Sequence, residues 1–192
     1  MKPNLRGGAG EEDHLKKCAI IICILLLAAF LGACGGSAAD KKLPETIRTQ
    51  DRRISIRVPE GWTEYETELG GHLVLVAKDS TDTAFVQIFR YEDVGKAAVK
   101  DYLSEAADFY GSAVAGSSDD VTINGQTGYY FAYKSPQADA SGNTYTCQGY
   151  EYFVPVGDDI VEVDIFYRYT EDTPNLDELA ILKSIAESLK AK

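Results

Sequence analysis

The chain has 192 residues, 45% of them hydrophobic and 26% charged, and a formal net charge of −11 at neutral pH. A surface with this excess of carboxylates repels phosphate backbones and anionic headgroups, which argues against nucleic-acid binding and against electrostatic adhesion to a membrane. The length fits one globular domain preceded by a short leader.

The first predicted element is an export signal. Lys16 and Lys17 precede an apolar run at residues 19–31, and the small residues Gly32 and Ala33 follow it. This order of basic, apolar and small residues is typical of a bacterial signal peptide. A spanning helix needs about 20 apolar residues, more than this run supplies. An uncleaved membrane anchor and an ordinary signal peptide are the alternatives to a lipoprotein signal.

The end of this leader resembles the lipobox of bacterial lipoproteins, in the four residues Leu31-Gly32-Ala33-Cys34. The resemblance implies that Cys34 receives a diacylglycerol, that residues 1–33 are removed, and that the protein is held on the extracytoplasmic face of the cell membrane. Acyl chains contribute about 0.8 kcal/mol per buried CH₂, so two chains anchor stably. Gly35 and Gly36 after the cysteine favour a Gram-positive surface.

The mature chain is predicted to consist of a flexible tether at residues 34–50 and a globular domain at residues 51–192. The tether is small and polar, contains Pro44 and lacks apolar periodicity. Without residues 1–33, which hold four basic and three acidic residues, the net charge changes from −11 to −12. Cys18 and Cys23 leave with the leader, so Cys147 is left without an intramolecular partner. We interpret Cys147 as a packed strand residue rather than a nucleophile.

Three strands are predicted at the start of the domain. Residues 54–58 alternate apolar and polar side chains, which is the pattern of a half-buried strand. Ordered structure is expected to begin near this strand. Pro59 and Gly61 break it, and Trp62 is expected to close one end of the core. Residues 73–77 form a continuous apolar run, expected to be buried on both faces, and residues 84–91 supply the third strand.

A helix follows, and then a series of hairpins. Apolar residues recur at spacings of three and four from Val99 to Ala113, Phe109 among them, and Gly111 and residues 116–120 are expected to end this helix. Asn124 and Gly125 favour a type I′ turn between strands at residues 121–123 and 127–134. Residues 135–143 form a predicted loop.

The last strands and the last helix complete the pattern. Residues 144–156 and 161–167 form two long strands, and in the second Glu162 and Asp164 alternate with apolar residues, which predicts a partly solvated face. Pro174 and Asn175 open a final helix with Asn175 as its N-cap. Leu182 and Ile185 belong to its buried stripe, and basic residues such as Lys190 lie towards its C-terminal end.

Hairpins connect most of these strands, which predicts an α+β fold with a mainly antiparallel sheet of six to seven strands flanked by helices. The motif Pro-Glu-Gly-Trp at residues 59–62, the three strands, the central helix, the Asn-Gly hairpin, the long strand pair and the last helix resemble the PsbP-like α/β/α sandwich. The family includes a photosystem II protein and many bacterial lipoproteins. The resemblance implies a binding or assembly protein, and it transfers no ligand residue to this chain.

Catalytic and metal motifs are sparse. His72 is the single histidine of the mature chain, and no hydrolase elbow, zinc-protease motif or phosphate loop is present. Paired carboxylates such as Glu92-Asp93, Asp119-Asp120, Asp158-Asp159 and Glu171-Asp172 lie at expected turns, where we interpret them as solvated charges rather than calcium ligands. We therefore predict no metal, no cofactor and no enzyme activity.

Tyrosines suggest a recognition surface. Eight of the twelve lie between Tyr129 and Tyr169, and Tyr130, Tyr150 and Tyr152 are the candidate residues for contact with a protein or glycan partner. The alternative is that they fill a sheet–helix interface. The sequence predicts an exported, lipid-anchored, non-catalytic binding or assembly module. A carboxylate-based extracytoplasmic hydrolase and a structural spacer without a discrete ligand are the other hypotheses.

Overall fold

The computed structural model describes residues 43–65, 71–115, 119–139, 141–170, 174 and 176–192. The predicted signal peptide, the predicted lipidation site Cys34, most of the predicted tether and the predicted N-cap Asn175 lie outside these residues. Within the described ranges, no helix is long and apolar enough to cross a bilayer.

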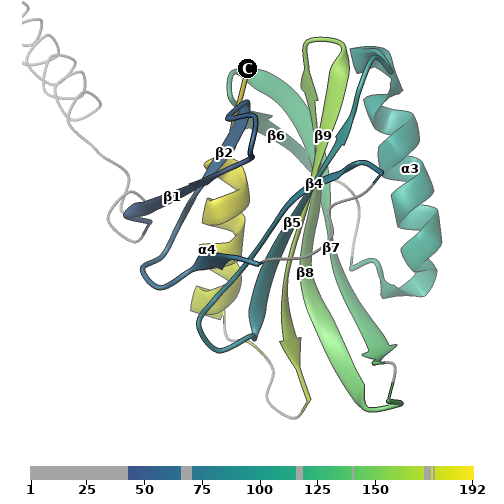
Figure 1. The fold of residues 1–192 in the computed structure, drawn as a ribbon. Helices are drawn as coiled ribbons and strands as arrows, with labels where there is room; N and C mark the ends of the chain where they lie inside the picture. Colours follow the sequence, from purple (N-terminus) through teal and green to yellow (C-terminus); the bar gives the residue numbers. More distant parts are fainter. Residues whose placement is uncertain (1–42, 66–70, 116–118, 140, 171–173, 175) are drawn as a thin grey trace, which may run out of the picture. The chain divides into compact units, whose positions relative to one another are not determined.

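A seven-stranded antiparallel sheet forms the centre of the fold (Figure 1). Across the sheet the strand order is β3, β4, β5, β9, β8, β7 and β6. The strands are β3 (Thr63–Glu64), β4 (Leu73–Lys78), β5 (Ala84–Tyr91), β6 (Asp119–Ile123), β7 (Gln126–Ala138), β8 (Thr144–Val156) and β9 (Asp159–Tyr169). The predicted α+β fold with a mainly antiparallel sheet is confirmed.

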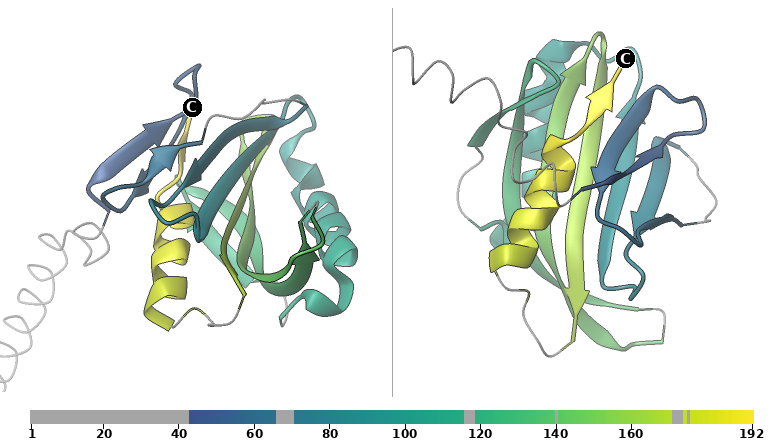
Figure 2. Two further views of the ribbon diagram at one scale, coloured as in Figure 1. Left: turned by 60° about the horizontal axis from the view of Figure 1, so that its bottom comes forward. Right: turned by 90° about the vertical axis from the view of Figure 1, so that its left-hand side faces the viewer.

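Two helices cover opposite faces of this sheet, as the two turned views show (Figure 2). Helix α3 (Val99–Tyr110), between the short 3₁₀ turns η1 (Lys96–Ala98) and η2 (Gly111–Ala113), buries Val99 and Leu103 against β7 and β8. Helix α4 (Leu176–Glu187) buries Leu182, Ile185 and Ala186 on the other face. The sheet therefore separates two apolar layers.

A second, three-stranded sheet completes the α4 side. Strand β2 (Ile54–Val58) lies between β1 (Glu45–Arg48) and β10 (Lys190–Ala191) and pairs antiparallel with both. Placing residues 45–49 in the tether was wrong, because backbone pairing with β2 and burial of Leu43 and Thr49 order this segment. Lys190 belongs to β10 rather than to the last turn of α4.

The Asn-Gly hairpin is confirmed. Asn124 and Gly125 have φ angles of 54° and 75°, the positive values that a type I′ turn requires, and they join β6 to β7. The Asn124 side chain also donates a hydrogen bond to the Ala191 carbonyl oxygen over 2.8 Å. β7 continues four residues past the predicted end at Lys134, because its pairing with β8 persists as far as Ala138.

Two predictions about single residues have opposite outcomes. Trp62 is 7% exposed and belongs to the core on the α4 side, as expected. Phe109 was expected on the buried stripe of the helix but is 83% exposed. Consecutive residues lie about 100° apart around a helix, so the orientation that turns Tyr110 towards the sheet turns Phe109 away from it.

Candidate functional site

The sheet face beneath α3 carries three carboxyl side chains near its centre. Glu162 and Asp164 come from β9, and Glu151 of β8 lies directly opposite Asp164 in the antiparallel register. The predicted solvation of this face is wrong at its centre, because Asp164 is 9% and Glu151 only 4% exposed. Helix α3 and the aromatic residues packed around it cover these groups.

Tyrosine hydroxyls hold two of these carboxyl groups. Tyr133 donates to Asp164 Oδ1 over 2.6 Å, and Tyr91 donates to Glu162 Oε2 over 2.7 Å. Glu151 Oε2 is buried and has no hydrogen-bond partner among the described residues. We call these five residues, Tyr91, Tyr133, Glu151, Glu162 and Asp164, the acid–tyrosine cluster.

Burial makes the carboxyl groups of this cluster poor acids. Loss of hydration raises the pKa of Asp164 to about 7, although the hydrogen bond from Tyr133 opposes the shift. Loss of hydration and then the nearby charge of Asp164 raise the pKa of Glu151 well above its usual range, and burial also raises the pKa of Glu162. The cluster therefore carries protons at pH values where surface carboxylates are ionised.

Beside α3, this face contains a pocket of about 300 Å³, which we call the aromatic pocket. Asp164 is the single carboxyl group among its lining residues, and Arg168 is the single cation. The lining residues are Phe85, Gln87, Tyr110, Tyr133, Gln137, Tyr145, Cys147, Asp164, Phe166 and Arg168.

The Arg168 guanidinium lies over two of the pocket's rings. Its carbon is 4.9 Å from the centroid of Phe85 and 5.5 Å from that of Tyr145. One of its nitrogens donates to the Asp82 carbonyl oxygen over 3.3 Å. Both ring distances fall within the range of cation–π attraction.

β8 approaches β9 closely at Gly149 on this face of the sheet. Gly149 lies between Tyr133 of β7 and Phe166 of β9 in the register, both of which line the pocket. A β-carbon at position 149 would overlap the Ile165 carbonyl oxygen and lie 2.6 Å from the Phe166 Cα. Only glycine therefore allows β8 and β9 to approach this closely here.

The three tyrosines predicted from the sequence do come together, on the face covered by α4. The ring centroids of Tyr130, Tyr150 and Tyr152 are 4.9 to 6.3 Å apart. Tyr152 is fully buried and presents no area to a partner, whereas Tyr130 and Tyr150 are partly buried. Lys183 of α4 donates a hydrogen bond to the Tyr130 hydroxyl over 2.8 Å. These contacts place the trio at the sheet–helix interface.

Cys147 and His72, also considered from the sequence, lie within the described part of the chain. Cys147 is buried, and burial raises the pKa of its thiol to about 11, which makes it a poor nucleophile. The exposed His72 ring lies 4.6 Å from that of Tyr91. Among the described residues no three His, Cys, Asp or Glu side chains are arranged to hold a metal ion.

Two of the acidic pairs, Glu92-Asp93 and Asp158-Asp159, meet around Arg90, whose guanidinium lies 3.5 Å from Glu92 Oε1 and 2.6 Å from Asp159 Oδ2. Asp119 and Asp120 lie on the edge strand β6, and the Asp159 carboxylate accepts hydrogen bonds from Arg90 over 2.6 and 2.8 Å. The Arg90 contact and a backbone hydrogen bond from Asp93 keep the pKa of Asp159 low despite its burial. The pair Glu171-Asp172 lies outside the described residues.

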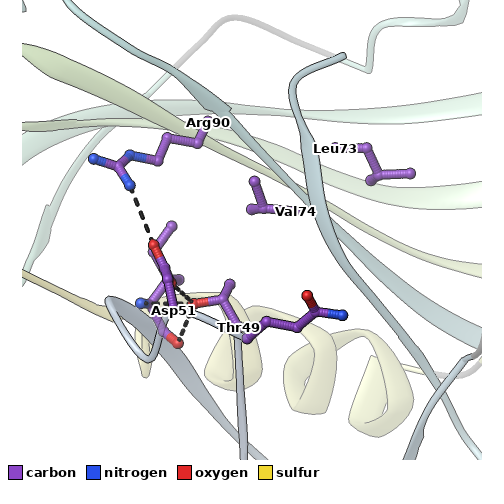
Figure 3. Close-up of a pocket in the computed structure, with 7 residues that line it drawn as sticks. Thr49, Asp51, Leu73, Val74 and Arg90 are labelled. Atoms are coloured by element: carbon purple, nitrogen blue, oxygen red, sulfur yellow. Dashed lines mark hydrogen bonds and ion pairs between the residues drawn. The ribbon is translucent and has the colours of Figure 1, made fainter. Parts of the chain in front are cut away.

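A second, smaller pocket lies between the two sheets and was missed from the sequence (Figure 3). It has a volume of about 230 Å³ and is lined by Thr49, Gln50, Asp51, Ile54, Leu73, Val74 and Arg90. Arg90 reaches from β5 towards Asp51, whose Oδ2 is 3.4 Å from its guanidinium. Assigning Thr49 and Gln50 to a tether concealed this site. Three aliphatic side chains and one ion pair in its lining indicate a junction between the sheets.

Comparisons with known proteins identify the fold. No family model matches the sequence, and no curated protein matches it. A cyanobacterial PsbP from Synechocystis superposes with a TM-score of 0.52 at 14% identity, over 84% of this chain and 99% of that protein. The Saccharomyces cerevisiae Ran-binding protein Mog1p superposes with a TM-score of 0.51 at 12% identity, over 77% of this chain and 94% of Mog1p.

A structure from Bacteroides thetaiotaomicron also superposes, with a TM-score of 0.51 at 16% identity. The match covers 77% of this chain and 48% of the Bacteroides chain, so the present chain spans about half of that protein's length. The predicted PsbP-like fold is confirmed, and the same architecture is present in Mog1.

Proposed function

We propose that this protein is exported, anchored to the extracytoplasmic face of the cell membrane through lipid on Cys34, and acts there as a non-catalytic binding module for a protein partner. This location is supported by the order of basic, apolar and small residues in the leader and by its lipobox-like end. The fold is shared with PsbP and with Mog1p, whose description as a Ran-binding protein supports a protein partner.

The aromatic pocket is the observation that carries the binding role. Its rings belong to Tyr and Phe, and Arg168 lies at its edge, which are residue types that concentrate at the centres of protein interfaces. Phe85, Tyr145 and Phe166 are each only partly buried, so part of each ring is available for contact. A spacer without a ligand would need no such pocket.

A carboxylate-based hydrolase fits the same face less well. The raised pKa values of Glu151 and Asp164 are a feature of catalytic acids. Hydrolysis by two carboxyl groups, however, requires both to reach the substrate from opposite sides of the scissile bond. Asp164 lines the pocket, whereas Glu151 does not line it and is 4% exposed. One accessible carboxyl group suits binding better than two-carboxylate catalysis.

Export and lipid anchoring are tested by intact-mass analysis of the protein purified from its own membranes. We expect a chain that begins at residue 34 and carries a diacylglycerol on Cys34. The Cys34→Ser variant should lack the lipid and leave the membrane fraction. An unmodified thiol at Cys34, or a leader still attached, would disprove the anchoring mechanism.

The binding role is tested by crosslinked affinity capture from the same membranes. The Tyr145→Ala variant removes one exposed wall of the pocket, and Phe109→Ala removes an exposed ring of α3 outside the pocket as a matched control. We expect a protein that is captured by the wild type and by Phe109→Ala but is depleted with Tyr145→Ala. Equal capture by both variants would argue against recognition through the pocket.

A further inference from the structure

We propose that the aromatic pocket binds a positively charged organic group, a guanidinium or an alkylammonium, with Asp164 as its counter-ion and the rings of Phe85 and Tyr145 as its walls. This inference rests on the proposed binding function and specifies the chemistry of the ligand. The source we favour is a basic side chain of the partner protein.

The chain already places a cation over two rings of the pocket. The guanidinium of Arg168 lies 4.9 Å from the Phe85 ring and 5.5 Å from the Tyr145 ring. The electron-rich faces of aromatic rings attract cations at such distances, and Arg and Lys side chains and quaternary ammonium groups use the same attraction. The two rings are therefore arranged for a cation, and Arg168 occupies their faces from within the chain.

The pocket has an acidic group in its interior. Asp164 is 9% exposed and lines the pocket, and Tyr133 satisfies its Oδ1. Opposite Asp164 on β8 lies Glu151, which is more than nine-tenths buried and has an oxygen without a partner in the described part of the chain. A cation entering the pocket would stabilise the ionised form of Asp164 and offset the cost of burying it.

The rings beneath Arg168 can become accessible to a ligand. Arg168 is an exposed residue, and the hydrogen bond from its side chain to the Asp82 carbonyl spans 3.3 Å, beyond the usual N–H···O range. Arg168 can therefore leave its place without breaking a strong interaction. A volume of about 300 Å³ is at the lower limit of ligand pockets, which fits one charged side-chain end rather than a large molecule.

Isothermal titration of the full lipidated protein, held in detergent micelles, tests the inference with probes of matched shape. N-acetyl-argininamide and N-acetyl-lysinamide should bind, whereas N-acetyl-citrullinamide, an uncharged isostere of the arginine probe, should bind at least about tenfold more weakly. A peptide whose only charged group is one arginine side chain should bind more tightly than N-acetyl-argininamide if the natural ligand is a protein segment. Equal affinity would assign the site to a free small cation and overturn the peptide source.

Variants separate the counter-ion from the resident cation. Asp164→Asn should weaken binding of N-acetyl-argininamide by at least about tenfold, while Arg168→Gln should tighten it by removing a competitor. Glu187→Gln, which removes a negative charge on the α4 side, is the control and should bind like the wild type. If Asp164→Asn fails to fold, Tyr145→Ala should still weaken binding, by about threefold or more.

Equal binding of the citrulline and arginine probes, unchanged binding by Asp164→Asn, or weaker binding by Arg168→Gln would each overturn the inference. These results would leave the capture of a partner through Tyr145 unaffected. Conversely, loss of partner capture with intact arginine binding would disprove the proposed function alone.

Discussion

The acid–tyrosine cluster should make the protein less stable as the pH rises from 5 to 8. Glu151 and Asp164 hold protons in the folded state at pH values where the unfolded chain has lost them, because burial raises their pKa. When the folded state binds more protons than the unfolded state, the free energy of unfolding falls with increasing pH. The most informative perturbation is Glu151→Gln, which resembles the protonated side chain in size and cannot ionise.

The expected magnitude follows from the linkage relation. Each carboxyl group that is protonated only in the folded state lowers the free energy of unfolding by about 1.4 kcal/mol per pH unit. For Glu151 this contribution begins above its ordinary pKa of 4.5 and continues until the raised folded-state pKa is reached. The Glu151→Gln variant should therefore gain about 3 kcal/mol relative to the wild type between pH 5 and pH 7.

Urea unfolding followed by the fluorescence of Trp62, the only tryptophan of the chain, provides the assay. Asp51, Asp79 and Asp159, whose pKa values are lowered by their hydrogen bonds, lose their stabilising effect only at more acidic pH and do not interfere. Glu187→Gln is the control and should parallel the wild type. Parallel curves for the wild type and Glu151→Gln from pH 5 to 8 would refute the reasoning.

Substitutions at three further positions test the framework by the same unfolding assay. Gly149→Ala should cost about 3 kcal/mol, because its β-carbon overlaps the Ile165 carbonyl, and an unchanged midpoint would contradict the geometry of β8. Arg90→Met should lower the free energy of unfolding by about 2 kcal/mol, because Asp159 loses its charged partner, and Arg90→Lys should be intermediate. Equal stability of the wild type and both variants would show the pair to be unimportant. Asn124→Ala should lower the free energy of unfolding by about 1 to 2 kcal/mol. Asn124→Gly should lower it less, because glycine adopts the positive φ of the turn although the hydrogen bond to Ala191 of β10 is lost. A larger loss for Asn124→Gly than for Asn124→Ala would be inconsistent with the turn.

Periodicity predicted most of the fold because the long elements bury one face each. The limits of β5 and β8 match residues 84–91 and 144–156, and the turn at Asn124 and Gly125 has the predicted φ angles. The short strands β1 and β10 could not be predicted. Each contributes few residues and is ordered by pairing with β2. β10 lies more than 130 residues further along the chain than β2.

The site was harder to predict than the fold. Alternation along β9 placed Glu162 and Asp164 on one face, but their burial depends on α3, which precedes β9 by about 50 residues. The aromatic pocket joins Phe85, Tyr145 and Arg168 from three different strands, and only the sheet register brings them together. Tyrosine abundance could not show which tyrosines line the pocket and which lie under α4.

Site-specific photocrosslinking in the native membrane tests recognition through the aromatic pocket most directly. A photoreactive residue is placed at position 145 in the pocket wall, at position 109 on the exposed side of α3, or at position 187 on α4. We predict one protein adduct that forms from position 145 and disappears when an excess of N-acetyl-argininamide is present. Adducts that form from position 187 alone, or that persist unchanged with the arginine probe, would contradict recognition of a basic partner in the aromatic pocket.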